Sequence, residues 1–314
     1  MKTRQQLIEF LDAKQRRVHF VGVGGCGMSG LAKILLQQGH HVTGSDLSPN
    51  GETDRLRALG AKVFSGHAAR HVTPDTDLVV FTSAVHGENE ELNAAEELKI
   101  PTVRRGLLLT ALMNHQNNIA VAGTHGKTTT TSMIAHVLTR SDSAPSFCVG
   151  AHVPVLGTNA QIGGGKYFVA EADESDGTLI GFTPEFAVCL NIEPEHLDFH
   201  GSMDRLLATF ESFVSSTLRS VFYCADCPAC GRRRHRRSQR LRASSDGSAR
   251  DDRRRADARA EAARRGVSTA PVHADSGVAL RIRNSLCRRG QTVFDRHLCC
   301  ERTTHRRRER LHDL

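Results

Sequence analysis

The sequence has no tryptophan, only two tyrosines and no apolar run of the roughly 18 residues that a membrane-spanning helix requires. Residues 1–17 are polar and charged, which excludes the apolar centre of a secretory signal peptide. Of the nine cysteines, only Cys26, Cys148 and Cys189 precede residue 223, too few for a disulfide framework. These absences predict a cytoplasmic protein with reduced thiols and no membrane partner.

Lysine is missing from the last part of the chain, although that part is strongly basic. Residues 223–314 contain 24 arginines, no lysine and 11 acidic residues, whereas residues 1–222 contain 18 basic and 23 acidic residues. The chain therefore falls into two parts of different composition. A length of 314 residues with 39% apolar residues is enough for two domains, each with a core.

Short apolar runs alternate with helical segments in residues 1–112, which predicts a Rossmann-like, doubly wound α/β domain. The first run, Val18–Val23, ends in glycines and precedes a helical stretch that reaches Leu36. The other strand candidates are His41–Gly44, Lys62–Phe64, Leu78–Thr82 and Pro101–Val103, and the other helix candidates are Glu52–Leu59 and Glu90–Leu98.

A second α/β series begins at Asn118, so we place the domain boundary at Met113–Asn118 and predict a partial P-loop ATPase domain over residues 113–222. Its helix over residues 128–138 is expected to turn Met133, Ile134 and Val137 inward. The strand candidates are Ile119–Ala122, Tyr167–Glu171 and Phe186–Asn191, and a further helix is expected over Ser202–Ser215.

The first chemical motif is Gly22-Val23-Gly24-Gly25-Cys26-Gly27, between the first strand and its helix. Without side chains, backbone N–H groups and the helix dipole can approach a diphosphate. Asp46 ends the next strand, at the spacing expected for a ribose ligand. Taken alone, the motif fits an NAD-dependent dehydrogenase as well as other nucleotide-binding proteins, or glycines needed only for a tight strand–helix crossing.

The second motif, Gly123-Thr124-His125-Gly126-Lys127-Thr128-Thr129, is more specific because a strand precedes it and a helix follows it. Backbone N–H groups of such a loop cradle phosphates, Lys127 would neutralise the β and γ oxygens, and the Thr128 hydroxyl can reach Mg²⁺. The loop departs from the common Walker spacing, since Val121 stands where the first glycine is usual. A chance Gly-Lys-Thr sequence in a loop is the alternative.

Two acidic segments follow strand candidates of the second series. Glu171-Ala172-Asp173-Glu174-Ser175-Asp176 ends one strand, and Asn191-Ile192-Glu193-Pro194-Glu195-His196-Leu197-Asp198 ends the next. Carboxylate oxygens at the carboxyl end of a strand beside a P-loop suit Mg²⁺, although a solvated acidic turn is the simpler interpretation. A single histidine is more often structural than a ligand, so His196 gains weight only from its neighbours.

These four motifs, in this order, resemble the Mur ligase family, which joins amino acids to UDP-muramic acid precursors of peptidoglycan. The resemblance covers roughly residues 15–222. The first glycine motif, with Met28-Ser29-Gly30 at its end, looks like the UDP-substrate loop of the branch that adds L-alanine to UDP-N-acetylmuramate, more than that of the related murein-peptide recycling ligase. The segment Gly123–Thr131 looks like the ATP loop.

The resemblance implies ATP and Mg²⁺ as cofactors and UDP-N-acetylmuramate and L-alanine as substrates. Lys127 would hold the γ-phosphate, Thr128 and Glu171 would bind one Mg²⁺, and His196 would bind a second ion near an acyl-phosphate. Lys127, Glu171 and His196 are accordingly the candidate catalytic residues. The implied ATP-binding residues are Gly123, Thr124, His125, Gly126, Lys127, Thr128 and Thr129.

The resemblance also changes the interpretation of the first loop, which would bind the diphosphate of a UDP-sugar and perform no hydride chemistry. The residues implied for the UDP substrate are Gly24, Gly25, Gly27, Asp46, His67 and Ser83.

Residues 223–314 depart from the family pattern, because the regular strand and helix patterns stop and arginine runs appear. We expect this tail to be irregular or disordered. A nucleic-acid-binding arm is disfavoured by its few aromatics and scattered acids, and the spacing of Cys224, Cys227 and Cys230 lacks a second pair for zinc. The preferred hypothesis is a reading-frame shift near codons 223–230. The chain would then carry only part of the ATPase domain. The resemblance implies ATP-dependent ligation of L-alanine to UDP-N-acetylmuramate through an acyl-phosphate, and the alternatives are a non-catalytic UDP-sugar-binding remnant or the related murein-peptide recycling ligase.

Overall fold

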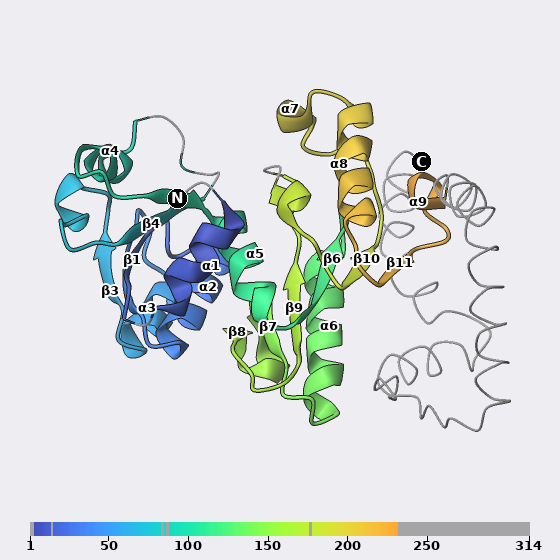
Figure 1. Ribbon diagram of the computed structural model, residues 1–314, viewed down its shortest axis with the longest axis horizontal. Coiled ribbons are helices and arrows are strands. Elements are labelled where there is room, and N and C mark those ends of the chain that lie inside the picture. Colours follow the sequence, from blue (N-terminus) through green and yellow to red (C-terminus); the bar gives the residue numbers. More distant parts are fainter. Residues whose placement is uncertain (1–2, 14, 83–84, 86–87, 176–177, 232–314) are drawn as a thin grey trace, which may run out of the picture. The chain divides into compact units, whose positions relative to one another are not determined.

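The computed structural model describes residues 3–13, 15–82, 85, 88–175 and 178–231. All of them belong to one compact unit, Met1–Arg234. Two sheets form within this unit, and helices pack against both (Figure 1). The predicted α/β fold class is confirmed. None of the described helices is both long and apolar enough to cross a membrane.

The first sheet has five parallel strands in the order β3-β2-β1-β4-β5, so β1 lies at its centre. Three of the four side chains of β1 after Arg17 are apolar, and all four are buried, as expected for a strand covered on both faces. Ligands of such folds bind where the strand order reverses, which is here the carboxyl end of β1. The strands are β1 Arg17–Val21, β2 His41–Asp46, β3 Lys62–Ser65, β4 Leu78–Phe81 and β5 Thr102–Arg104.

Five α-helices and one 3₁₀ turn accompany the described part of this sheet. They are α1 Arg4–Asp12, α2 Cys26–Gln37, α3 Gly51–Ala58, η1 Ala69–His71, α4 Glu90–Glu97 and α5 Arg105–Leu112. Sequence analysis missed α1, although its start carries a capping signal: the Thr3 side chain accepts from the Gln6 N–H at 3.2 Å, and the Gln6 side chain accepts from the Thr3 N–H at 3.3 Å.

The second sheet has six strands in the order β11-β10-β6-β9-β7-β8, and only the β7–β8 pair is antiparallel. Two central strands, β6 and β9, are apolar and buried along nearly their whole length. The strands are β6 Asn117–Ala122, β7 Ser146–Val153, β8 Thr158–Gln161, β9 Tyr167–Glu171, β10 Phe186–Cys189 and β11 Ser220–Tyr223. Sequence analysis missed β7 and β8 and placed the end of β10 at Asn191 instead of Cys189.

The helical segments of the second series include α6, which begins within the loop motif Gly123–Thr129, and α8, which has three apolar buried side chains on one face. Their bounds, with the shorter turns, are η2 Met113–His115, α6 Lys127–Arg140, η3 Pro154–Leu156, η4 Thr178–Gly181, α7 Leu197–His200, α8 Met203–Ser215 and α9 Pro228–Gly231. Thus β11 and α9 reach into the predicted tail, whose residues from 232 onward lie outside the described part of the chain.

The inward face of α6 differs from the prediction. Met133 and Val137 are 47% and 54% exposed, whereas Thr131, Ala135 and Leu138 are buried. The face of α6 that packs on β7 and β9 carries Thr131, Ala135 and Leu138, whereas Met133 and Val137 lie on the other side and Ile134 is half-buried.

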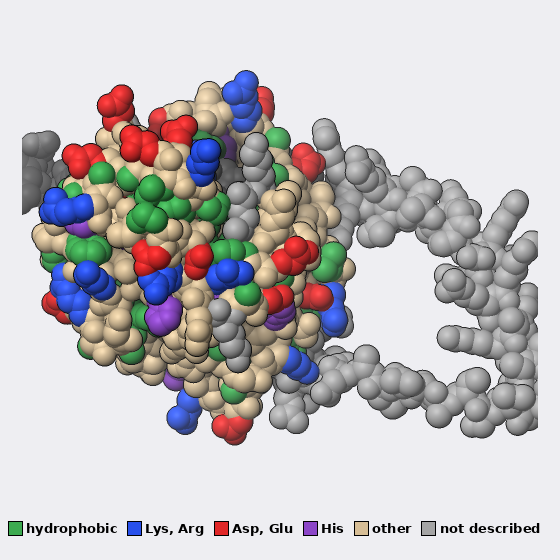
Figure 2. All heavy atoms as spheres, turned by 60° about the vertical axis from the view of Figure 1, so that its left-hand side comes forward, with side chains coloured by type: hydrophobic (Ala, Val, Ile, Leu, Met, Phe, Trp, Pro, Cys, Tyr) green, Lys and Arg blue, Asp and Glu red, His purple; other side chains and the backbone are tan. Residues whose placement is uncertain are grey.

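Charged side chains of both signs are interspersed over the face of the molecule presented in Figure 2. Among the described side chains on this face, neither sign gathers into a single field. The concentrated positive charge of the sequence belongs to residues beyond 231.

The orientation of α6 predicts that one substitution on this helix lowers the free energy of unfolding, whereas another has almost no effect on it. Ala135→Leu adds volume to a fully buried position and is expected to lower the free energy of unfolding by about 1–3 kcal/mol. Val137→Lys changes a side chain that is 54% exposed and should stay within about 0.5 kcal/mol of the unmodified protein. Denaturant unfolding followed by circular dichroism measures both, and the reverse order of effects would contradict this orientation.

Candidate functional site

The loop between β6 and α6 depends on two glycines. Gly123 and Gly126 adopt φ angles of 147° and 80°, which other residues rarely adopt. Gly126 is the N-cap of α6, and the helix begins at Lys127 without a capping side chain. The unsatisfied N–H groups and positive dipole end of this helix are therefore available to an anion.

The segment that follows β10 holds this loop in place. Asn191 accepts from the His125 N–H through Oδ1 at 2.8 Å and donates to the His125 carbonyl through Nδ2 at 3.2 Å. Its own carbonyl accepts from the Thr124 N–H at 3.1 Å, and the Thr124 hydroxyl accepts from the Glu193 N–H at 2.9 Å. Sequence analysis included Asn191 in a motif but assigned it no role. This role of the Asn191 amide in holding the loop Gly123–Thr129 becomes visible only because β6 and β10 are adjacent in the sheet.

Lys127 lies at the first position of α6, and its ammonium group is held by a buried acid. Its Nζ lies 2.8 Å from both carboxylate oxygens of Glu174 and donates to the Gly123 carbonyl at 2.7 Å. The Glu174 side chain is only 1% exposed. This pair fixes Lys127 over the loop, and Glu174 is therefore a site residue that sequence analysis did not single out.

Thr128 and Glu171, which the sequence assigned to one metal ion, do lie together. The Thr128 hydroxyl donates to Glu171 Oε2 at 3.3 Å, and Glu171 Oε1 accepts from the Gly150 N–H at 2.6 Å. Burial raises the pKa of Glu171 above its usual value, despite opposing contributions from the Gly150 N–H, the Thr128 hydroxyl and the charge of Lys127. The Thr128 hydroxyl in the first turn of α6 and the Glu171 carboxylate at the end of β9 are hard oxygen donors, which fit Mg²⁺ with water completing its shell.

A second acid of the same segment, Asp173, binds an arginine from the first series of elements. Arg105 donates from Nη2 to Asp173 Oδ2 at 2.9 Å. Burial alone would raise the pKa of Asp173, but the Arg105 charge and the Ser175 N–H together lower it. A Cβ at Gly27 would lie only 2.9 Å from the Arg105 guanidinium, so the first glycine motif also meets this pair. Sequence analysis gave Arg105 no role, because no local pattern relates it to residue 173.

His196 occupies a different environment from Thr128 and Glu171. It is exposed, has a left-handed backbone with φ of 53° and stands at the N-cap of α7. The buried histidine of this segment is His200, whose Nε2 lies 2.8 Å from the Glu174 carbonyl. Among the described side chains, no three of the His, Cys, Asp and Glu type are arranged to hold a metal ion. The role of His196 as a second metal ligand stays a prediction.

The glycine loop after β1 is closed by two side chains. Asp46 Oδ2 accepts from the Gly24 N–H at 2.7 Å, and Asn50 Nδ2 donates to the Gly24 carbonyl at 3.1 Å. A Cβ at Gly24 would stand 2.7 Å from Asp46 Oδ2, so only glycine permits this approach. Gly25 is the N-cap of α2 and has no side chain to cap the helix, which leaves its N-terminal N–H groups for an anion.

His67, a predicted UDP-site residue, belongs to a buried cluster around Glu91. Its Nδ1 lies 3.0 Å from Glu91 Oε2, and His71 Nδ1 lies 2.7 Å from Glu91 Oε1. Burial opposes ionisation of Glu91, but contacts with His19, Ser45 and His71 outweigh it and lower its pKa to about 2. Glu91 therefore remains a carboxylate that orients the ring of His67.

The predicted site residue Ser83 lies outside the described residues. Most of the remaining predicted residues form two groups, and His196 lies in neither. Gly24, Gly25 and Asp46 share the carboxyl end of the first sheet, and the loop Gly123–Thr129 shares that of the second sheet with Glu171 and Glu174.

Comparison with known proteins bears on both groups. The description of the Mur ligase family, catalytic domain, matches residues 17–117, and that of the Mur ligase middle domain matches residues 121–282. The second match extends past residue 222, where sequence analysis placed the end of the resemblance.

Individual relatives carry related names. The UDP-N-acetylmuramate–L-alanine ligase of Streptomyces coelicolor is 50% identical over 204 residues, which are 65% of this chain and 44% of the relative. That of Methylobacillus flagellatus is 46% identical over 221 residues, or 68% and 46% of the two chains. The chain thus spans slightly under half the length of these curated relatives.

Two solved structures are similar to the chain. The UDP-N-acetylmuramate–alanine ligase of Thermotoga maritima is 33% identical with a TM-score of 0.65, covering 68% of this chain and 50% of that one. The UDP-N-acetylmuramate:L-alanyl-gamma-D-glutamyl-meso-diaminopimelate ligase of Neisseria meningitides is 27% identical with a TM-score of 0.64, covering 69% and 74%. With its two sheets, its glycine loops and a middle-domain match over more than half its length, this chain belongs to the Mur ligase family.

Proposed function

We propose that the chain carries the UDP-sugar site and part of the ATP site of an enzyme that joins L-alanine to UDP-N-acetylmuramate in peptidoglycan precursor synthesis. The observation that carries this proposal is the loop Gly123–Thr129, with Lys127 at the helix start and Thr128 beside Glu171. The names of the relatives from Streptomyces and Methylobacillus support the choice of substrates. We place the reaction in the cytoplasm, in keeping with the free cysteines among the described residues.

In this proposal the loop N–H groups and Lys127 bind the β and γ phosphates of ATP. Thr128 and Glu171 would hold Mg²⁺, which would supply positive charge for the transferring phosphoryl group. The muramate carboxylate attacks the γ-phosphorus in line, ADP leaves, and an acyl-phosphate forms. The amine of L-alanine then attacks the acyl carbon and expels phosphate, so that an amide bond replaces the acyl–phosphate bond. Lys127 stabilises the charge in the first of these steps.

The loop Gly22–Gly25, with Gly27, Asp46 and His67, would bind the UDP part of the substrate. Gly24 and Gly25 supply the close backbone approach, and the start of α2 supplies a positive field for the diphosphate. Asp46 holds the loop through the Gly24 N–H in addition to any contact with the ribose. The alternative ligase reaction is the one in the name of the Neisseria relative, which joins UDP-N-acetylmuramate to L-alanyl-gamma-D-glutamyl-meso-diaminopimelate.

A second candidate function is UDP-sugar binding without turnover. The observation that favours it is the loop after β1, whose Gly24 contacts with Asp46 and Asn50 involve no residue of the loop Gly123–Thr129. Purified protein with ATP, L-alanine and UDP-N-acetylmuramate discriminates the two functions, because the ligase releases phosphate only when all three are present. A binding remnant would show UDP-sugar binding by calorimetry and no phosphate release.

For residues 223–314 we propose a shifted reading frame that begins near codons 223–230, on the grounds that lysine disappears and arginine accumulates there. The nucleotide sequence of this stretch, read in all three frames, is expected to restore the family pattern in another frame. An unbroken frame together with an intact mass of the native protein that matches the 314-residue chain would contradict the proposal.

Substitution of Lys127 separates its contribution to the stability of the fold from its proposed contribution to phosphate binding. Lys127→Met leaves Glu174 buried without its cation and is expected to cost about 3–5 kcal/mol of unfolding free energy. The double variant Lys127→Met, Glu174→Gln removes the uncompensated charge and should regain most of that stability. Calorimetric titration with a non-hydrolysable ATP analogue and Mg²⁺ should still detect no binding to the double variant. Normal analogue affinity in the stable double variant would exclude Lys127 from the phosphate site.

The second prediction concerns pH. Because burial raises the pKa of Glu171, its carboxylate form is lost on acidification at a higher pH than for an ordinary glutamate. By linkage, this group favours folding as the pH falls through the raised pKa, while its affinity for Mg²⁺ declines over the same range. The gain in affinity for the ATP analogue that Mg²⁺ provides should therefore decrease on acidification. In Glu171→Gln this gain should be small and should change little with pH. An identical pH profile in the variant would assign the titration to another group.

A further inference from the structure

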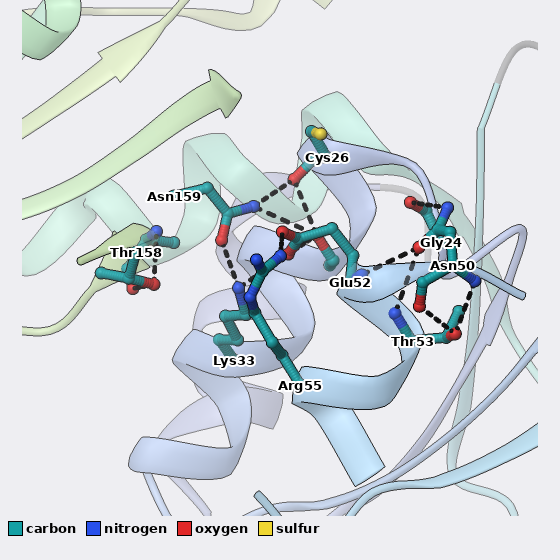
Figure 3. Close-up of polar contacts among 11 residues, drawn as sticks. Gly24, Cys26, Lys33, Asn50, Glu52, Thr53, Arg55, Thr158 and Asn159 are labelled. Atoms are coloured by element: carbon teal, nitrogen blue, oxygen red, sulfur yellow. Dashed lines mark hydrogen bonds and ion pairs between the residues drawn. The ribbon is translucent and has the colours of Figure 1, made fainter. Parts of the chain in front are cut away.

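The glycine motif of the first sheet has two halves with different surroundings. Gly22–Gly25 form the loop at the end of β1, whereas Ser29, Gly30 and Lys33 lie in α2 and are buried against β7 and β8 of the second sheet. Figure 3 shows Lys33 and the start of α2 meeting Asn159 of β8. The residues of α2 that follow the loop therefore pack against the second sheet, which also carries the loop Gly123–Thr129.

Asn159 is fully buried and uses both ends of its amide on the first domain. Its Nδ2 donates to the Cys26 carbonyl at 2.8 Å and to the Ser29 hydroxyl at 3.1 Å. Its Oδ1 accepts from Lys33 Nζ at 2.5 Å. Cys26 is the first residue of α2, directly after the loop, so the Asn159 amide binds the helix at the point where the loop ends.

The surroundings of Gly30 show the same close approach of β7 and β8 to α2. A Cβ at this position would lie 3.1 Å from Cys148 Sγ, 3.2 Å from the Ala160 Cβ and 3.5 Å from Asn159 Nδ2. Glycine inside a helix costs about 1 kcal/mol relative to alanine, and here its lack of a side chain allows β7 and β8 to reach the helix backbone. The helix is thus built to receive Asn159.

A second path leads from Asn159 to the loop through charged groups. Lys33 Nζ lies 2.7 Å from Glu52 Oε2, which also accepts from the Ser29 hydroxyl at 3.1 Å. Glu52 stands in the first turn of α3, whose N-cap Asn50 donates to the Gly24 carbonyl at 3.1 Å. Although burial of Glu52 would raise its pKa, its contacts with Lys33 and Ser29 lower it, which favours the carboxylate form of Glu52.

We infer that Asn159, a residue of the ATP-loop sheet, is a positioning residue for the diphosphate loop Gly22–Gly25 of the UDP-sugar site. This inference rests on the function proposed for that loop. An amide is required because one group must donate to the Cys26 carbonyl and accept from Lys33 at the same time. The UDP loop is then held in its binding conformation only while β8 is docked on α2.

Two variants and one matched control test this role in the full chain. Asn159→Asp keeps an acceptor for Lys33 but loses both donated hydrogen bonds, and Asn159→Leu loses all three contacts. Asn118→Leu removes another buried asparagine amide, whose partners, the Met113 carbonyl and the Glu185 N–H, are away from α2. The control accounts for any general loss of stability.

Amide hydrogen exchange of the segment covering residues 22–30 is the primary measurement, because it needs no ligand. Both Asn159 variants should exchange about tenfold faster there, the change expected when a buried carbonyl loses its donor, while Asn118→Leu leaves this segment unchanged. Unchanged exchange in both Asn159 variants, or an equal increase in the control, would overturn the inference.

Calorimetric titration with UDP then relates the loop to the proposed function. We expect UDP affinity to fall about tenfold in both Asn159 variants and to stay normal in Asn118→Leu. Normal UDP affinity in Asn159→Leu would refute the positioning role while leaving the proposed UDP site intact. If the unmodified chain bound no UDP, the proposed function of the loop would fail, and the inference that this loop is positioned for UDP would fail with it, even where hydrogen exchange shows that Asn159 orders the segment.

Discussion

The chain must turn sharply from β6 into α6 with no side chain in the way, and the second site depends on this constraint. Gly123 and Gly126 take left-handed conformations, and a Cβ at Gly123 would lie 3.0 Å from the Leu190 Cβ. Because the turn is tight, the start of α6 stands at the carboxyl end of the central strand, with its N–H groups unsatisfied. Asn191 holds His125 of this loop through both ends of its amide. The backbone geometry thus leaves the start of α6 open to an anion.

Buried charge then determines where the functional side chains lie. Lys127 with Glu174, Arg105 with Asp173 and Lys33 with Glu52 are three pairs whose partners come from different elements. A buried charge without its partner is costly, so each pair specifies one arrangement more than it adds stability. Two of these pairs also connect the elements of the first sheet with those of the second: Arg105 contacts Asp173 directly, and Lys33 reaches Asn159. These contacts join α2 and α5 to β8 and to the segment after β9.

Some of this organisation was readable in the sequence. The alternation of apolar runs and helical segments predicted the α/β class, and the family resemblance implied that Thr128 and Glu171 lie together, as they do. The inward face of α6 was predicted wrongly for Met133 and Val137, because packing on β7 and β9 buries Ala135 and Leu138 instead. Asn191, Glu174 and Asn159 carry no sequence signal of their own, since an asparagine or glutamate in a loop or short strand is usually solvated.

The sequence by itself determined the alternation of strands and helices, apart from α1, β7 and β8, and the positions of the glycine turns, because these depend on neighbours within a few residues. Only the tertiary structure decided which acid holds Lys127, which amide shapes the loop at His125 and which residue of the second sheet grips α2. Those contacts join positions as far apart as Lys33 and Asn159. They arise from strand order and from the need to pair every buried polar group, and neither is encoded in a local pattern.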